Sequence, residues 1–324
     1  MPEPSDFTTA PASAGKLSVL AAIGSGAWGS TLAALARRNG HTVRCWSRRG
    51  SAPLDAVLAE ADIVLSAVSM PGVIPTIERL QAAAPPPRVP IITATKGLDA
   101  ASARTPSQLW QAAFPQHPIV VLSGPNLAGE IQQGRPAATV AASRSPAAAG
   151  LTQQLLASRR FRVYANADPL GTELGGTLKN VIAIAAGVCD GLQLGANAKA
   201  ALLTRALPEM TRIGTALGAS TEAFFGLSGL GDLLATCESP LSRNYRVGYG
   251  LAQGQLLDRI LAALEGTAEG INTTQVLVAL AQRQAIAAPI AQEVEALTAG
   301  RTAPQAAVEN LMARELKSEF CDIA

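Results

Sequence analysis

The hydrophobic pattern of the chain changes about halfway along its length. In the first half, short uncharged apolar runs recur, each closed by glycine, proline, serine or a charge, with amphipathic stretches between them. Apolar runs that alternate with helical patterns predict parallel strands joined by crossover helices. The predicted strands are Leu17–Ile23, Thr42–Trp46, Ile63–Val68, Val89–Ala94, Ile119–Leu122 and Ala138–Ala142.

From Asp168 onward, apolar residues instead recur at the three- and four-residue spacing of a helix face. The clearest such stretches are residues 170–185, 200–217 and 272–284. We therefore predict an α/β protein with a doubly wound domain at residues 16–167, followed by an all-α C-terminal domain at residues 168–324. Residues 1–15 are rich in Pro, Ala, Ser and Thr, a composition that predicts a disordered tail.

A glycine motif follows the first predicted strand. Residues Gly24–Gly29 read GSGAWG and open an amphipathic helix that ends near Arg38, which is the context of a dinucleotide-binding loop. In such a loop Gly24 permits the tight turn, Gly26 lets the backbone approach a pyrophosphate, and Gly29 lets the helix pack closely on the sheet. The helix N-terminus adds N–H donors and a positive dipole end. The motif predicts a Rossmann-type domain that binds NADPH or NADH.

The end of the second predicted strand bears on the choice between these two cofactors. An acidic residue there would bind the ribose 2′-hydroxyl, but the chain reads Trp46-Ser47-Arg48-Arg49. Because no carboxylate repels a 2′-phosphate, we hypothesise that NADPH binds at least as well as NADH, with Arg48 favoured over Arg49 as the contact. The alternative is that both arginines lie in a solvated turn and do not contact the cofactor.

Composition and charge narrow the class of protein. The chain has 324 residues, of which 48% are hydrophobic, and its net charge is only +2, so neither nucleic acid nor a membrane surface is an expected partner. The uncharged stretch 17–36 contains three glycines and follows an acidic leader, which argues against a signal peptide or a membrane span. The cysteines are too far apart for a metal site, so we expect no metal and a reduced, cytoplasmic chain. They are Cys45, Cys189, Cys237 and Cys321.

Two lysines stand alone in apolar segments. Lys96 follows a strand, at the edge of the sheet where open α/β folds bind ligands. Lys179 is the only charge between Glu173 and Asp190, on a helix too apolar to be solvated all round. A buried lysine shifts its pKa readily, which suits a proton donor or acceptor in carbonyl reduction. The alternatives are an exposed loop lysine at position 96 and a lysine at 179 that extends from a core helix to solvent.

Asp232 is likewise the only charge between Glu222 and Glu238, in a glycine-rich stretch. A buried carboxylate must pair or take up a proton, and we predict Lys179 as its counter-ion and Asp232 as part of the catalytic group. The alternative is an exposed residue at a helix N-terminus.

Two further segments offer groups for a ligand. Gly124 and Asn126 follow the fifth predicted strand, where the glycine brings backbone N–H groups close to a ligand and Asn126 either contacts it or caps the next helix. The run Ser242-Arg243-Asn244 carries donors suited to a phosphate, although a solvated arginine accounts for it equally well.

These motifs together resemble the NAD(P)-dependent glycerol-3-phosphate dehydrogenases of the bacterial type, over nearly the whole chain beyond the tail. The resemblance is carried by GSGAWGSTLA from Gly24, ATKGL from Ala94, SGPNLAGE from Ser123, ELGGTLKNVIAIAAG from Glu173, GLGDLLATC from Gly229, SRN from Ser242 and EGINT from Glu269. It implies reversible reduction of dihydroxyacetone phosphate to sn-glycerol 3-phosphate by NAD(P)H, which supplies glycerophospholipid synthesis.

The resemblance also implies roles for individual residues. Lys179 would be the acid–base residue at the C2 oxygen, and Lys96 would contact both the substrate and the nicotinamide end of the cofactor. The other implied substrate residues are Gly124, Asn126, Asp232, Ser242, Arg243 and Asn244. The implied cofactor residues are Ala27, Trp28, Arg48, Ala128, Arg243 and Glu269.

The sequence departs from the family pattern in several places. Asn126 stands where Ser or Thr is usual, Gly129 where Lys is common, and Ser69-Met70-Pro71 replaces a Pro-Ser pair. The segment Gly50–Ala61 is shorter than its counterpart, which affects contacts on the adenosine side and any interface built from it. A homodimer is left open.

Two other functions fit the same residues less well. One is a two-domain reductase that acts on a 2-hydroxy acid or a ketopantoate-like substrate, which a test of substrate charge would separate. The other is a non-catalytic NAD(P) sensor, which would tolerate the loss of Lys179.

Overall fold

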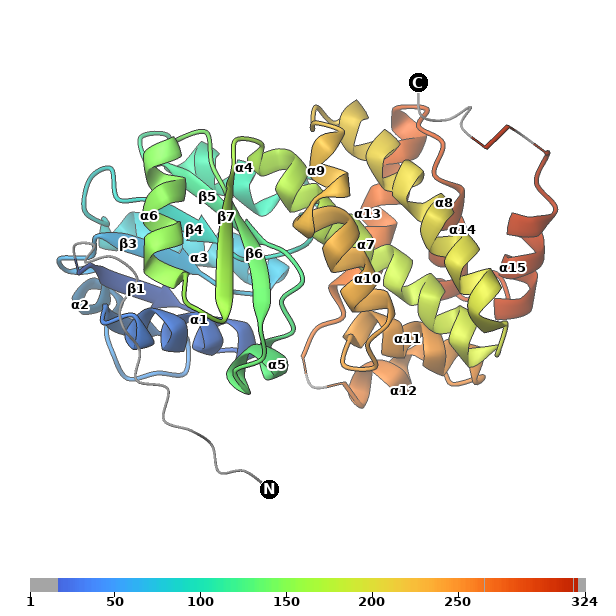
Figure 1. The fold of residues 1–324 in the computed structure, drawn as a ribbon, viewed down its shortest axis with the longest axis horizontal. Coiled ribbons are helices and arrows are strands. Elements are labelled where there is room, and N and C mark those ends of the chain that lie inside the picture. The colour runs from blue at the N-terminus through green and yellow to red at the C-terminus, as the bar shows by residue number, and fades with distance from the viewer. Residues whose placement is uncertain (1–16, 265, 317, 320–324) are drawn as a thin grey trace.

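The computed structural model describes residues 17–264, 266–316 and 318–319, so the predicted tail lies outside the described residues. Figure 1 shows an α/β half beside a helical half, with the long helix α7 (Pro169–Gly191) running from one into the other. This arrangement confirms the predicted fold class. None of the helices in the described ranges has both the length and the apolarity that crossing a membrane requires.

One seven-stranded sheet forms the centre of the α/β half, with strand order β2-β1-β3-β4-β5-β6-β7. The strands are β1 (Val19–Ile23), β2 (Thr42–Trp46), β3 (Ile63–Ser66), β4 (Ile91–Thr93), β5 (Ile119–Ser123), β6 (Ala137–Ala142) and β7 (Phe161–Asn166). Six of them lie where the apolar runs predict. The seventh, β7, was not predicted because it is an edge strand of sequence FRVYAN whose exposed positions break up any apolar run.

The expectation that all strands run parallel is wrong at one position. β6 pairs antiparallel with β5, whereas the other neighbouring pairs are parallel. The chain between β5 and β6 contains only the five-residue helix α5 (Ala128–Gln132). A parallel return needs a crossover long enough to bring the chain back to the opposite edge of the sheet, and this connection instead turns at the same edge.

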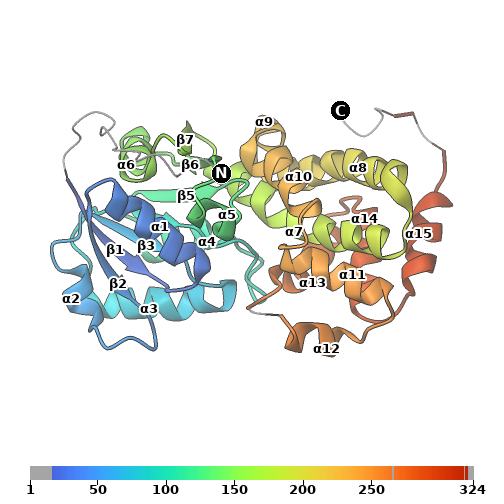
Figure 2. The ribbon, with the colours of Figure 1, turned by 60° about the horizontal axis from the view of Figure 1, so that its bottom comes forward.

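Helices cover both faces of the sheet, as a doubly wound fold requires (Figure 2). Buried aliphatic residues of one face pack under α1 (Ala27–Arg38), α5 and α6 (Pro146–Leu156). The other face packs under α2 (Leu54–Leu58), α3 (Val73–Ala83) and α4 (Pro106–Ala113). A single turn, η1 (Met70–Gly72), precedes α3. The strands buried on both faces are therefore continuously apolar, which is why the sequence pattern reveals them.

The helical half packs around α7, which is buried along almost all of its length. The three stretches with helical spacing correspond to α7, α8 and α13 and are confirmed. The remaining elements are α8 (Gly195–Ala216), α9 (Glu222–Phe225), the π-helical turn η2 (Leu227–Gly231), α10 (Asp232–Cys237), α11 (Arg243–Ala252), α12 (Leu257–Ala262), α13 (Glu269–Arg283), α14 (Pro289–Thr298) and α15 (Pro304–Met312).

Helices α7 and α11 cross with their backbones in contact, because glycines face each other at the crossing. A Cβ atom on Gly248 would lie 1.8 Å from the carbonyl oxygen of Ile184, and one on Gly187 would lie 2.0 Å from the carbonyl oxygen of Tyr245. No side chain fits there without moving one helix. The crossing therefore fixes the position of the N-terminal end of α11.

We expect Gly248→Ala to lower the free energy of unfolding by about 2 kcal/mol, because overpacking at the crossing outweighs the gain in helix propensity. Denaturant unfolding measures the change. Gly150→Ala is the matched control, since Gly150 lies within α6 and a Cβ placed on it would have open space around it, and it should stabilise by about 0.5–1 kcal/mol. Equal effects of the two substitutions would contradict the crossing argument.

Candidate active site

The glycine motif forms a tight turn between β1 and α1. Gly24 has a φ of +106°, and a Cβ there would lie 2.7 Å from the carbonyl oxygen of Ala67. A Cβ on Gly29 would lie 2.2 Å from the carbonyl oxygen of Gly24. Each position therefore excludes a side chain for the reason that the motif predicts: one allows the turn and the other brings helix and sheet together.

Gly26 faces open space at the N-terminus of α1. It is the N-cap residue, no side chain caps the helix, and no atom lies within 4 Å of a Cβ placed there. The first N–H groups of α1 are thus left for a ligand, and the positive end of the helix dipole favours an anion. The residues present fit the pyrophosphate of a dinucleotide.

The other expected cofactor residues surround this helix end. Ala27 and Trp28 form its first turn, and Ala128 begins α5, which is tied to α1 by a 2.8 Å hydrogen bond from the Gln132 amide to the Thr31 hydroxyl.

On the far side of the turn, Arg48 and Arg49 follow β2 with exposed side chains. The structure thus places both arginines beyond the end of the strand, where the sequence predicts an adenosine contact.

A buried carboxylate and two lysines form the centre of the site. Lys179 on α7 donates to Asp232 Oδ1 on α10 at 2.9 Å, and Lys96 from the loop after β4 donates to Asp232 Oδ2. Lys179 is 6% exposed and Asp232 2% exposed. The alternatives in which Lys179 extends to solvent and Asp232 is an exposed helix start are therefore wrong. The side chain of Lys96 is 22% exposed, so this lysine forms the solvent side of the cluster.

Thr236 completes the cluster and was missed by the sequence analysis. Its hydroxyl accepts a hydrogen bond from Lys179 and donates to Asp232 Oδ1 at 3.2 Å. It lies one turn after Asp232 on α10, and that four-residue spacing on one helix face was the signal that could have found it.

The surroundings change the acidity of Lys179. Burial lowers its pKa to about 8, the negative charge of Asp232 acts against this shift, and the nearby positive charge of Lys96 adds to it. A lysine with a pKa close to the working pH can both release and take up a proton, which is what a reversible carbonyl reduction needs.

Glycines on α7 let the sheet approach these lysines. A Cβ on Gly176 would lie 2.2 Å from Ser123 Oγ and 3.3 Å from Lys96 Cε. The backbone N–H of Gly97 donates to Thr177 Oγ1 at 3.1 Å, which holds the Lys96 loop against α7. The carboxyl ends of β4 and β5 therefore meet α7 directly.

The structure brings Gly124 and Asn126 to the same place. Lys96 Nζ donates to the Gly124 carbonyl oxygen at 3.3 Å. The Asn126 amide donates to Thr139 Oγ1 at 2.8 Å, while its buried Oδ1 has no partner among the described residues. Leu127, not Asn126, is the N-cap residue of α5, so the capping alternative is wrong.

The run from Ser242 to Asn244 begins α11. Ser242 caps this helix by accepting from the Tyr245 N–H at 3.2 Å, and Asn244 Oδ1 accepts from the Gly270 N–H at 3.0 Å. Arg243 between them is exposed. Ser242 and Asn244 therefore hold the helix end in place, while the side chain of Arg243 is exposed at the surface.

Glu269 connects the two halves of the molecule. It starts α13, and its carboxylate accepts a hydrogen bond from the backbone N–H of Met70, in the turn after β3, at 3.3 Å. Burial raises the pKa of this carboxyl, and the charge of Arg243 acts in the opposite direction. Glu269 and Arg243 thus lie at the same interdomain edge as the ends of the strands.

A Rossmann-type domain with an open helix N-terminus, joined to a helical half that carries a buried lysine–carboxylate pair, is typical of NAD(P)-dependent dehydrogenases with a helical second half. Two family profiles match the chain. The N-terminal part of NAD-dependent glycerol-3-phosphate dehydrogenase matches residues 19–52 and 49–149, and the C-terminal part matches residues 168–309. The chain belongs to the NAD-dependent glycerol-3-phosphate dehydrogenase family.

Individual relatives agree with this assignment. The chain is 61% identical over 298 residues to the glycerol-3-phosphate dehydrogenase [NAD(P)+] of Trichormus variabilis, covering 92% of this chain and 97% of that protein. It is 60% identical over 301 residues to the protein of the same name from Acaryochloris marina, covering 93% and 97%. The crystal structure of glycerol-3-phosphate dehydrogenase from Coxiella burnetii superposes with a TM-score of 0.88 at 34% identity, covering 92% of this chain and 99% of that one.

Proposed function

We propose that the cluster of Lys96, Lys179 and Asp232 is where this chain carries out the reaction of its family. That reaction is the reversible reduction of dihydroxyacetone phosphate to sn-glycerol 3-phosphate with NAD(P)H, which supplies glycerophospholipid synthesis. The observation that carries the proposal is the buried Lys179–Asp232 pair, joined by Lys96 from the loop after β4, at the same edge of the sheet as the glycine turn after β1. Substitution of Lys179, described in the Discussion, is the test.

Each residue of the cluster has a separate task in this proposal. The Lys179 ammonium gives a proton to the C2 oxygen of the ketone, and Thr236 and Asp232 orient that ammonium by accepting from it. Lys96 stabilises the negative charge that develops on the same oxygen. NAD(P)H, when bound, supplies the hydride. In the reverse direction the free amine of Lys179 takes up the proton of the glycerol hydroxyl.

The N-terminal end of α11 is the proposed phosphate site. Arg243 provides the guanidinium, Ser242 and Asn244 fix the helix end from which it extends, and the helix dipole adds positive potential there. The Gly124 carbonyl oxygen accepts from Lys96, and Asn126 Oδ1, which has no partner among the described residues, would accept from a substrate hydroxyl.

Arg243→Ala tests the phosphate site. We expect KM for dihydroxyacetone phosphate to rise about 10- to 100-fold, because a charge-assisted contact to the phosphate is lost, while turnover of unphosphorylated dihydroxyacetone changes little. Steady-state kinetics with both ketones measures this. Arg246→Ala on the same helix is the control and should leave both unchanged. Equal losses with both ketones would favour a reductase for an unphosphorylated substrate.

Arg48 is the proposed contact to the 2′-phosphate of NADPH. For Arg48→Ala we expect KM for NADPH to rise about tenfold while KM for NADH stays the same, because only NADPH carries the second charge. Initial rates with each cofactor measure the change, and Arg49→Ala is the matched control. Unchanged NADPH kinetics in Arg48→Ala would remove Arg48 from the site.

We further propose that residues 16–167 bind the cofactor and residues 168–324 the substrate, and that the protein is a cytoplasmic homodimer. Exposed apolar side chains on the helical half, such as Leu241 and Leu256, support self-association, and the free thiols of the described cysteines support a reducing compartment. Light scattering of the purified chain gives the oligomeric state, and cell fractionation gives the location.

A further inference from the structure

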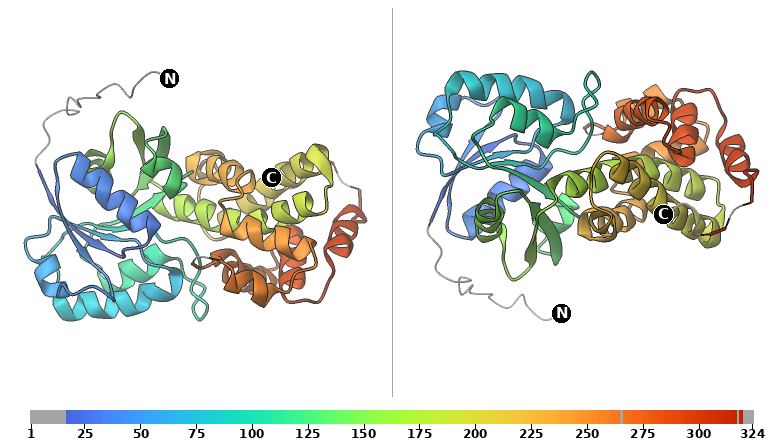
Figure 3. Two further views of the ribbon diagram at one scale, coloured as in Figure 1. Left: turned by 90° about the horizontal axis from the view of Figure 1, so that it is seen from below. Right: turned by 90° about the horizontal axis from the view of Figure 1, so that it is seen from above.

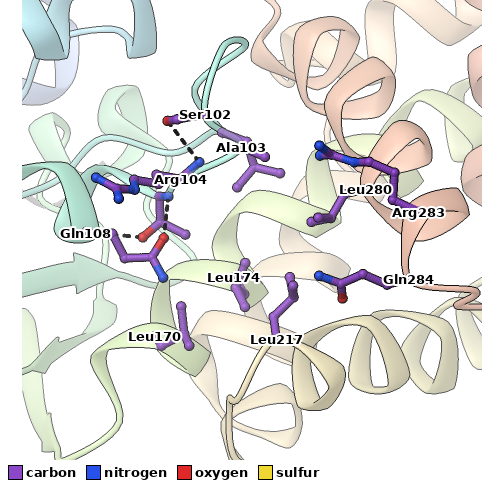
Figure 4. Close-up of a pocket in the computed structure, with 12 residues that line it drawn as sticks. Ser102, Ala103, Arg104, Gln108, Leu170, Leu174, Leu217, Leu280, Arg283 and Gln284 are labelled. Atoms are coloured by element: carbon purple, nitrogen blue, oxygen red, sulfur yellow. Dashed lines mark hydrogen bonds between the residues drawn. The ribbon is translucent and has the colours of Figure 1, made fainter.

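A cavity of about 430 Å³ lies between the two halves of the molecule, apart from the residues assigned to the reaction. Five leucines contribute to its walls, and Figure 4 shows four of them around it. They are Leu98, Leu170, Leu174, Leu217 and Leu280. Polar and charged side chains share the lining with these leucines, and a concave site of this size with both kinds of wall can hold a small amphipathic molecule.

The cavity is separated from Lys179 by the body of α7. Leu174 and Leu170 precede Lys179 by five and nine residues, which places them roughly 140° and 180° around the helix from it. On the other side, the segment from Leu98 to Thr105 closes the cavity. Figure 3 shows this segment, between β4 and α4, reaching from the α/β half toward the helical half. A ligand there would not occupy the proposed substrate site.

The charged residues that line the cavity are all positive. Arg104 from the α/β half and Arg283 from α13 both line it, and no acidic residue is among the described residues that do. The nearby carboxylates are already engaged: Asp99 accepts from the N–H and hydroxyl of Ser102, and Glu173 accepts from those of Ser107. Neither arginine side chain has a hydrogen bond or ion pair with another described residue. Both arginines are exposed, so they form a positively charged rim where the head group of an anionic ligand could pair with them.

The segment that forms this wall is held in one conformation. The Asp99 N–H donates to the Arg104 carbonyl oxygen at 2.9 Å, and the Ala103 N–H donates to the Asp99 carbonyl oxygen at 2.9 Å. The Asn272 amide on α13 donates to the Leu98 carbonyl oxygen at 2.9 Å, which ties the same segment to the helical half. The cavity is thus preformed, and binding would not require the loop to become ordered first.

We propose that this cavity binds a small amphipathic anion, an alkyl carboxylate or an alkyl phosphate, whose hydrocarbon body contacts the leucines and whose head group pairs with Arg283 and Arg104. Hydrocarbon contact and charge pairing are both required, because the apolar walls have no affinity for a bare anion and the arginines none for a bare chain. Leu98 lies two residues after Lys96, so a ligand in the cavity would contact the same loop that carries Lys96.

Calorimetric titration of the full chain tests this proposal, with octanoate and octyl phosphate as the two probes. We expect saturable binding of one anion per chain. The probe that binds more tightly identifies the preferred head group. Octanol and inorganic phosphate, each with half of the required chemistry, should bind at least about tenfold more weakly.

Arginine variants decide where the probe binds. The double variant Arg104→Gln/Arg283→Gln should weaken binding at least about tenfold, with its melting temperature and its kcat and KM unchanged, whereas Arg259→Gln on α12 should bind like the parent chain. Unchanged affinity in the double variant would overturn the proposal. So would loss of binding in Arg243→Gln alone, because the probe would then occupy the proposed phosphate site.

Discussion

Lys179→Ala is expected to lower kcat for reduction of dihydroxyacetone phosphate by about 10³- to 10⁴-fold, with the Kd for NADPH nearly unchanged. The reason is that the other donors of the described cluster are held elsewhere: Lys96 donates to Asp232 and to the Gly124 carbonyl oxygen, and Thr236 donates to Asp232. Stopped-flow oxidation of NADPH measures the rate, and cofactor fluorescence measures the affinity.

A small primary amine gives this experiment a second readout. Methylamine added to Lys179→Ala should restore part of the lost rate, because the substitution leaves space beside Asp232 for an ammonium group. A variant that keeps more than about a tenth of the parent rate would show that the proton comes from elsewhere, since a general acid contributes at least about 10².

Asp232→Asn is expected to move the pH dependence of the reaction. Burial lowers the pKa of Lys179 to about 8, and the charge of Asp232 is what limits that shift, so its removal should lower the pKa further, by about two to three units. In the parent, reduction uses the ammonium and should fall as the pH rises through about 8, whereas oxidation uses the free amine and should rise over the same range. Both midpoints should shift to lower pH in the variant, with kcat for reduction at pH 7 down about 10- to 100-fold.

Thr236→Val is the matched comparison for Asp232→Asn. It removes a hydrogen bond to Lys179 and to Asp232 but no charge, so the midpoints should stay close to those of the parent while kcat falls only a few-fold. Full pH profiles of kcat in both directions measure the difference. Identical midpoints in the parent and in Asp232→Asn would mean that Asp232 does not control the protonation of Lys179.

Much of the α/β half could be predicted because its signals are local. A strand buried on both faces must be apolar throughout, so β1, β3 and β5 stand out in the sequence. The turn after β1 requires glycine, because a Cβ atom on Gly24 or Gly29 would clash with a backbone carbonyl oxygen. β7 was missed because an edge strand is buried on only part of its surface, which leaves a mixed pattern.

The central ion pair could also be predicted, because an isolated charge in an apolar helix needs a partner. Lys179 and Asp232 were each the only charge in their segment. Lys96 was also identified, but nothing local indicates that it shares the Asp232 carboxylate with Lys179. Thr236 was missed because a threonine on an apolar helix is usually a packing residue.

The sequence alone determined six of the seven strands, the helices α7, α8 and α13, the place of the dinucleotide loop, and two of the charges that are buried, Lys179 and Asp232, since each follows from burial or steric limits within a few residues. Only the tertiary structure decided that β6 runs antiparallel, that Lys96 pairs with Asp232, that Glu269 accepts from Met70, and that Arg104 and Arg283 line one cavity. These facts depend on how helices cross and where connections return, and packing between distant segments sets both.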